Sequence, residues 1–98
     1  MKLRNLSCIY ILDDARILML NKMGSRIFHE PLWVGVGGHF EKDELNDPDK
    51  CVLRELGEET GLDFEDIEGL TLKYITLRQT RQEIRQQYIY FASLYNKG

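Results

Sequence analysis

A glutamate-rich stretch between an aspartate–proline pair and a glycine is the feature that most constrains this chain. Asp47-Pro48 is typical of a helix start, because aspartate caps free N–H groups and proline suits the first helical position. Gly61 is typical of the left-handed residue that ends a helix. The sequence therefore predicts a helix over residues 48–60.

One face of that helix concentrates charge. Successive helical residues rotate by roughly 100°, and one face then receives four charged side chains, Arg54, Glu55, Glu58 and Glu59. Like charges three or four residues apart oppose helix formation by about 0.2–0.5 kcal/mol per pair, so this face suits a bound cation. Oxygen ligands favour Mg²⁺ or Mn²⁺ over zinc. The alternative is a plain solvated acidic face, and the helix alone leaves both interpretations open.

The flanking residues extend the pattern. Gly38 and Glu44 precede the helix, Gly61-Leu62 follows it, and Arg54-Glu55-Leu56-Gly57-Glu58-Glu59 lies between them. Together these residues resemble the Nudix box, the signature of enzymes that hydrolyse nucleoside diphosphates linked to another group. The box spans residues 38–62 here. It differs from the family pattern by nine residues, in place of seven, between Glu44 and Arg54; we assign the extra two to positions 45 and 46.

The resemblance implies a metal-dependent hydrolase. Its implied metal ligands are the side chains of Glu55, Glu58 and Glu59 and the backbone carbonyl of Gly37, with Mg²⁺ as the expected ion and Mn²⁺ as an alternative. The resemblance also implies that Glu55 acts as general base and that Arg54 and Glu58 belong to the catalytic set.

Three positions have two open roles. Arg54 either orients Glu55 or forms an ordinary salt bridge with Glu58. Glu44 either supplies a further ligand or holds its loop in place. The pair Gly37-Gly38 either allows close backbone approach to a metal or forms a turn at a strand end.

The residues before the box indicate a substrate class. Trp33-Val34-Gly35-Val36-Gly37-Gly38 resembles the Trp-x-Gly-x-Gly-Gly segment of the Nudix enzymes that remove oxidised purine nucleotides, the 8-oxo-dGTP diphosphatases. By that resemblance Trp33 stacks on a base with help from Phe28, and Gly38 also contacts substrate. Trp33 has the alternative role of a core aromatic residue.

These observations give a leading function and two alternatives. The leading function is metal-dependent hydrolysis of a nucleoside triphosphate, with 8-oxo-dGTP as first candidate, to a nucleoside monophosphate and pyrophosphate. The first alternative is the same chemistry on ADP-ribose, a dinucleotide or a capped RNA. The second is a non-catalytic module that binds a nucleotide.

Length, net charge and cysteine content further limit the class of protein that this chain can be. The 98 residues suffice for one domain, and a net charge of −3 gives no general attraction for a nucleic-acid polymer. Two cysteines without a signal sequence or a membrane-length apolar run predict reduced thiols. We therefore expect a cytoplasmic enzyme whose partner is a small nucleotide.

Apolar patterns predict strands around the helix, at residues 6–12, 17–20, 32–36, 70–77 and 84–94. The last of these has apolar side chains on both faces, which predicts cover on both sides. The Nudix resemblance implies an α/β/α sandwich with a mixed sheet, whose final strand and C-terminal helix have no counterpart in residues 1–98. We therefore expect one truncated domain, or self-association that covers the exposed sheet face.

Overall fold

The computed structural model describes residues 1–13, 16–18, 20–22, 32–34 and 36–95. Two short 3-10 turns, η1 (Lys42–Glu44) and η2 (Phe64–Asp66), flank the helix α1 (Pro48–Thr60). The strands are β1 (Lys2–Asp13), β2 (Arg16–Leu18), β3 (Leu20–Lys22), β4 (Leu32–Val34), β5 (Val36–His39), β6 (Ile67–Gln79) and β7 (Glu83–Leu94).

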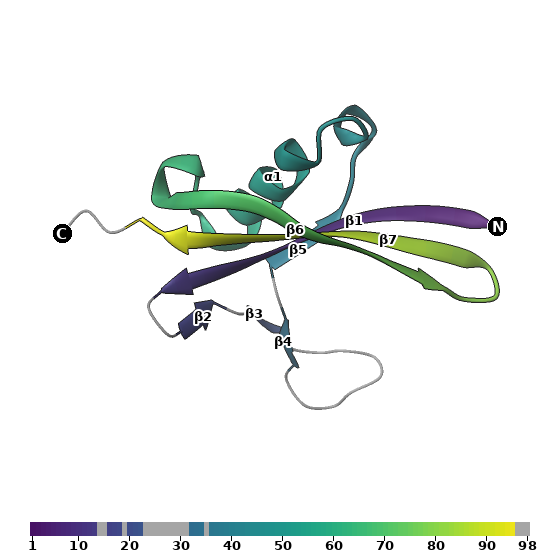
Figure 1. Ribbon diagram of the computed structural model, residues 1–98, viewed down its shortest axis with the longest axis horizontal. Coiled ribbons are helices and arrows are strands. Elements are labelled where there is room, and N and C mark those ends of the chain that lie inside the picture. Colours follow the sequence, from purple (N-terminus) through teal and green to yellow (C-terminus); the bar gives the residue numbers. More distant parts are fainter. Residues whose placement is uncertain (14–15, 19, 23–31, 35, 96–98) are drawn as a thin grey trace.

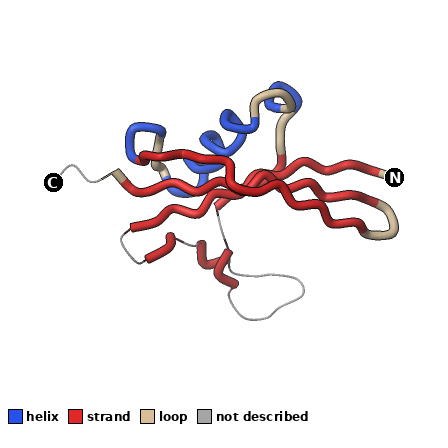
Figure 2. Tube along the Cα trace, viewed as in Figure 1, coloured by secondary structure: helices blue, strands red, loops and turns tan. Residues whose placement is uncertain are grey.

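Five of these strands form one mixed sheet. Its strand order is β2-β1-β7-β6, and β5 pairs with β1 beside β2. The β1–β7 pair is parallel and the other pairs are antiparallel. Figure 1 shows α1 on one side of this sheet and the β3–β4 pair on the other, and Figure 2 shows the same division by secondary structure.

Local capping signals set the ends of α1 at the predicted residues. The Asp47 carboxylate accepts a hydrogen bond from the Lys50 N–H at 3.2 Å, and Pro48 occupies the first turn. At the other end Gly61 has φ of 77°, and its N–H donates to the Gly57 carbonyl. Both caps satisfy backbone groups that a helix end leaves unpaired. The predicted helix over residues 48–60 is confirmed.

The core lies between α1 and the sheet. Val52 and Leu56 of α1 are fully buried against Ile9 of β1 and Val36 of β5. Tyr90 of β7 is also buried, and its hydroxyl donates to the Asp49 carboxylate at 2.5 Å. This packing fixes the orientation of α1, because its apolar face has only one surface to cover.

The glycine pair lies inside a strand, where the sequence predicted that the strand ends. The predicted strand over residues 32–36 is in fact two, β4 and β5, and β5 continues through Gly37 and Gly38 to His39. Pairing with Ser7 and Cys8 of β1 holds this segment extended. The strand-end turn considered for Gly37-Gly38 is therefore wrong, because tertiary pairing outweighs the weak strand propensity of glycine.

The two faces of β7 differ in cover. Tyr90 and Ala92 are buried beneath α1, whereas Ile89 and Phe91 on the opposite face are only partly buried. Within the described residues, α1 covers one face of this strand, and the predicted full cover of the other face is not seen there. The neighbouring edge strand β6 exposes Tyr74, Ile75 and Leu77.

Nowhere in the described part of the chain does a helix combine the length and the apolar composition needed to span a bilayer. The α-helix of this part has 13 residues.

Leu56→Ala tests the packing of α1. Leu56 is fully buried, so the substitution removes apolar contacts and leaves a cavity, and we expect the free energy of unfolding to fall by about 2–5 kcal/mol. Urea denaturation measures the change. Leu45→Ala is the matched control, because Leu45 is 56% exposed. Equal losses in the two variants would contradict the packing described here.

Candidate active site

The carboxylate of Glu55 lies directly against the backbone of Gly38. A Cβ added to Gly38 would stand 2.7 Å from both Cδ and Oε1 of Glu55. Only glycine permits this approach, because any other side chain would displace the carboxylate. The Glu55 side chain is 13% exposed, so the contact holds a nearly buried carboxylate at the strand that carries the glycine pair.

Gly37 makes the second contact between β5 and the helix. Its N–H donates to Oε2 of Glu59 at 3.2 Å. On its other side a Cβ would stand 2.0 Å from the Ser7 carbonyl oxygen of β1. The glycine pair therefore brings β5 close to both β1 and α1. Glu55 contacts Gly38, and Glu59 contacts the neighbouring residue Gly37.

Arg54 joins the acidic side chains into one network. Its Nη1 lies 3.0 Å from Oε1 of Glu55 and donates to both oxygens of Glu58 at 3.1 Å. Its Nη2 donates to the His39 carbonyl at 3.0 Å, at the end of β5. The structure therefore contains both contacts considered for Arg54, the one with Glu55 and the salt bridge to Glu58.

Glu44 is the buried partner of Arg54. Its carboxylate receives Nε of Arg54 at 2.7 Å and Nη2 at 3.1 Å, a bidentate ion pair. The backbone N–H of Glu41 donates to it at 2.8 Å. The hydrogen bonds from Arg54 lower the pKa of Glu44 to about 2, against an ordinary value of 4.5, despite the opposing effect of burial. These contacts correspond to the loop-holding role considered for Glu44.

Glu44 also belongs to a second acidic group. Oxygen atoms of Glu41, Asp43 and Glu44 lie within 4.8 Å of one another. Glu44 is occupied by Arg54, however, and Asp43 forms an exposed ion pair with Lys50. We interpret this group as the structure of the loop before α1. The carboxylates of Glu55, Glu58 and Glu59 do not form so compact a group, and Arg54 lies between the first two.

Two further contacts were not foreseen from the sequence. The buried thiol of Cys51 donates to the Ser7 hydroxyl at 3.3 Å, which ties α1 to β1. Burial raises the pKa of Cys51 to about 11, so the thiol stays protonated and acts in packing. The His39 carbonyl, the acceptor for Arg54, gives no sequence signal because any residue presents a carbonyl group.

Of the two residues expected to bind a base, Trp33 and Phe28, only Trp33 belongs to the described residues. The backbone of Trp33 belongs to β4 and pairs with Asn21 of β3. Phe28 lies outside the described residues, as does His29. The structure therefore places Gly37, Gly38, Arg54 and the glutamates together, and it does not test the contribution of Trp33 or Phe28.

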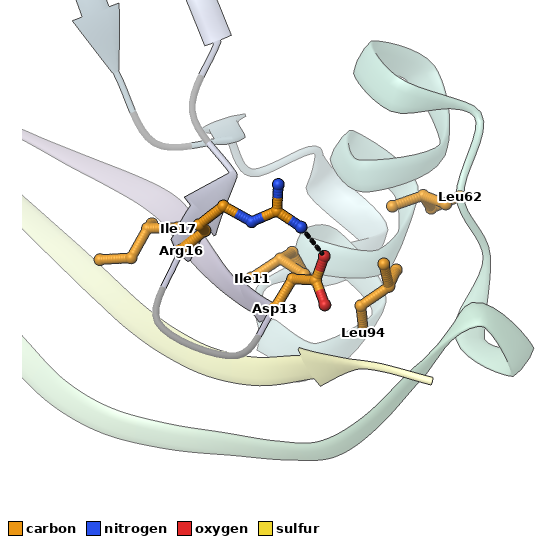
Figure 3. Close-up of a pocket in the computed structure, with 6 residues that line it drawn as sticks. All are labelled: Ile11, Asp13, Arg16, Ile17, Leu62 and Leu94. Atoms are coloured by element: carbon orange, nitrogen blue, oxygen red, sulfur yellow. Dashed lines mark hydrogen bonds and ion pairs between the residues drawn. The ribbon is translucent and has the colours of Figure 1, made fainter. Parts of the chain in front are cut away.

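A cavity of about 370 Å³ lies away from these carboxylates. Figure 3 shows its lining of four aliphatic side chains and the ion pair between Arg16 and Asp13, at 3.0 Å. None of the implied metal ligands contributes to it.

The sequence matches the family model of the NUDIX domain over residues 1–97. The chain belongs to the Nudix family. The match covers nearly all of the residues that build the sheet, the helix and the glycine strand.

Solved Nudix structures share this fold. The ORF135 protein of E. coli superposes with a TM-score of 0.71 and 24% identity, covering 93% of this chain and 61% of that one. A MutT Nudix hydrolase from Burkholderia pseudomallei gives 0.76 and 22%, covering 98% and 70%. The Nudix domain of Shewanella oneidensis NrtR, solved with ADP ribose, gives 0.67 and 15%, covering 99% and 62%.

These superpositions confirm the α/β Nudix sandwich fold with a mixed sheet. The chain spans about three fifths of the E. coli and S. oneidensis proteins and seven tenths of the B. pseudomallei protein. Of these three structures only the S. oneidensis domain is named with a nucleotide, ADP ribose, so the shared fold leaves the substrate of this chain open.

The site residues fit the divalent cation that Nudix hydrolases generally use. The donors are carboxylate oxygens from one helix face, the ligand type preferred by hard cations such as Mg²⁺. The missing Cβ of Gly38 lets the Glu55 carboxylate lie against the glycine strand, where the Gly37 N–H also holds Glu59. Glu55, Glu58 and Glu59, with the Gly37 carbonyl, are the ligands that the family resemblance implies for this ion.

Glu44→Gln tests the ion pair with Arg54. The pKa of Glu44 is lower in the folded state than its ordinary value, so its stabilising contribution is complete above pH 4.5 and is lost as the pH falls toward 2. We expect the variant to lose about 2–4 kcal/mol of unfolding free energy at pH 7. The difference from wild type should shrink steadily below pH 4.5.

Urea denaturation at several pH values between 7 and 3 measures this difference. Asp43→Asn is a suitable control, because the Asp43–Lys50 pair is exposed and exposed pairs contribute little. A stability difference between wild type and Glu44→Gln that does not change with pH would contradict the assignment.

Proposed function

We propose that this chain hydrolyses a phosphoanhydride bond of a nucleotide with a divalent cation. The observation that carries the proposal is the approach of the glycine strand β5 to the acidic face of α1. Gly38 lies against the Glu55 carboxylate, and the Gly37 N–H binds Glu59. This arrangement supports the Nudix chemistry implied by residues 38–62.

The residues of the chain have distinct roles in this proposal. Glu55 takes a proton from the attacking water, whose oxygen forms the new bond to phosphorus as the bridging oxygen leaves with the other phosphate group. Arg54 orients Glu55 through its 3.0 Å contact and holds Glu58 beside it. A bound Mg²⁺ would lower the pKa of water and neutralise phosphate charge.

The proposed substrate is a nucleoside triphosphate, with 8-oxo-dGTP as leading candidate, and the products are a nucleoside monophosphate and pyrophosphate. The support for this choice is the resemblance of residues 33–38 to the segment of the 8-oxo-dGTP diphosphatases. Trp33 and Phe28 are proposed to stack on the base, and Gly38 to allow the nucleotide to approach the backbone.

Two alternatives remain for experiment. The first is hydrolysis of another nucleoside diphosphate derivative, such as ADP-ribose, a dinucleotide or a capped RNA; the match to an ADP-ribose-bound Nudix domain favours testing it. The second is a module that binds a nucleotide without turnover.

A substrate panel with Mg²⁺, scored by product, separates the three proposed functions. Pyrophosphate supports the leading proposal, two monophosphates from ADP-ribose support the first alternative, and binding without product supports the second.

Metal binding is expected to stabilise the fold. If Glu58 and Glu59 hold the ion, millimolar Mg²⁺ or Mn²⁺ should raise the melting temperature by mass action. Glu58→Gln and Glu59→Gln should each reduce this rise, measured by thermal denaturation followed by circular dichroism. Glu65→Gln is the control, because Glu65 is an exposed glutamate outside the box. An unchanged melting temperature in folded wild type would favour the solvated acidic face.

Glu55→Gln separates catalysis from binding. A general base acts mainly in the transition state, so kcat should fall by about 10² to 10⁴-fold. Nucleotide affinity, measured by calorimetry on the same variant, should change far less. Near-normal turnover would remove Glu55 from the mechanism, and Glu65→Gln again provides the matched control.

Self-association of the chain would cover the apolar side chains that β6 exposes. The mass of the protein in solution tests for self-association directly.

A cytoplasmic location fits the two free thiols, Cys8 and Cys51. Fractionation of the source cells tests this location.

A further inference from the structure

Three arginines lie side by side across three strands of the sheet. In the strand register, Arg85 of β7 pairs with Arg4 of β1 on one side and with Arg78 of β6 on the other. Paired residues project from the same face of a sheet, and adjacent strands are about 4.8 Å apart. We call Arg4, Arg85 and Arg78 the arginine row.

The row lies on the face of the sheet opposite α1. Ser7 of β1 contacts Cys51 of α1, and Arg4 is three positions from Ser7, so its side chain projects from the other face. Figure 1 shows β1, β6 and β7 running on beyond α1 toward the N-terminus, which is where the row lies. The side chains are accessible there: those of Arg4 and Arg85 are 35% and 47% exposed.

The charge of the row is only partly balanced. Glu83 pairs with both Arg4 and Arg85, and the register places Lys2 opposite Glu83 as well. Within the described part of the chain, the Arg78 side chain has no ion-pair or hydrogen-bond partner. Like charges placed directly opposite destabilise a sheet. A row of three arginines with one shared carboxylate is therefore suited to a bound anion.

The row begins next to the candidate active site. Nη1 of Arg4 lies 3.4 Å from Nε2 of His39, and a cavity of about 230 Å³ is lined in part by Lys2, Arg4 and His39. His39 directly follows the glycine pair, and its carbonyl accepts the hydrogen bond from Arg54. Arg4 is three residues from Ser7, the β1 partner of Gly38, which is about 10 Å along the strand. A substrate that extends from the acidic face of α1 to the row therefore does so with a phosphate well removed from the scissile bond.

We propose that the arginine row binds a phosphate group of the nucleotide substrate at a distance from the scissile bond. A short polyphosphate fits better than a nucleic-acid strand, because Arg4 and Arg78 are only about 10 Å apart across two strand spacings. The net charge of −3 also repels a long polyanion beyond the row. This inference rests on the proposed function and adds a phosphate subsite to the same site.

Tripolyphosphate binding to the 98-residue chain tests the inference, measured by calorimetry in buffer freed of divalent metal. Without metal the carboxylates of α1 repel phosphate, so the measurement isolates the row. We expect wild type to bind, and Arg78→Gln and Arg85→Gln each to weaken binding by roughly tenfold. Arg78→Gln is the safer variant for folding, because it breaks no ion pair in the described part of the chain.

Arg16→Gln is the matched control. It removes the same charge from the cavity of Figure 3, at the other end of β1, and should leave tripolyphosphate affinity unchanged. The inference is overturned if wild type does not bind, if the row variants bind like wild type, or if Arg16→Gln weakens binding equally. A single-stranded oligonucleotide that binds more tightly than tripolyphosphate would also overturn it, in favour of a nucleic-acid surface. The proposed hydrolysis can fail with Mg²⁺ while this binding pattern holds, so the two failures are distinguishable.

Discussion

The bidentate ion pair between Arg54 and Glu44 is the interaction on which the rest of the site depends. It joins α1 to the loop that precedes it, at 2.7 and 3.1 Å, with Glu44 fully buried. The same guanidinium also reaches the end of β5 through the His39 carbonyl. A buried carboxylate is costly without a partner, so neither residue tolerates loss of the other. One side chain thereby fixes the helix, the loop and the glycine strand relative to one another.

Close approach between the backbone of β5 and the side chains of α1 is the second constraint on the site. Arg54 binds the end of β5 through the His39 carbonyl, and no space remains for a side chain at position 38, where Glu55 lies within 2.7 Å of the missing Cβ. Gly37 is confined in the same way between the Ser7 carbonyl and Glu59. The glycine pair thus allows β5 to lie close to β1 and α1. Both glycines are extended, because β5 pairs with β1 through them.

Charge is separated between the two sides of the sheet. The helix and its preceding loop carry the carboxylates, whereas the opposite face carries the arginine row with Glu83 as its shared counter-ion. This separation suits a substrate that is itself a polyanion. A cation at the acidic face and the guanidinium groups at the row would both attract phosphate, and the two sides meet near His39.

The sequence by itself determined the helix and the family. Asp47-Pro48 and Gly61 act on backbone groups within a few residues, so both ends of α1 could be predicted. The contact of Arg54 with Glu58, four residues later on the helix, follows from helical spacing as well. The choice between two roles for Glu44 could not be made in advance, because it depends on how the loop folds back onto Arg54, ten residues later.

Only the tertiary structure decided the rest. Gly37 and Gly38 were expected at a strand end, but pairing with β1 extends the strand through them. Arg78 and Arg85 face each other across one hairpin, but Arg4 is more than 70 residues away in sequence, and only the parallel register of β1 and β7 places it beside them. Capping and helical spacing act locally along the chain, whereas strand register is set by the packing of the whole sheet.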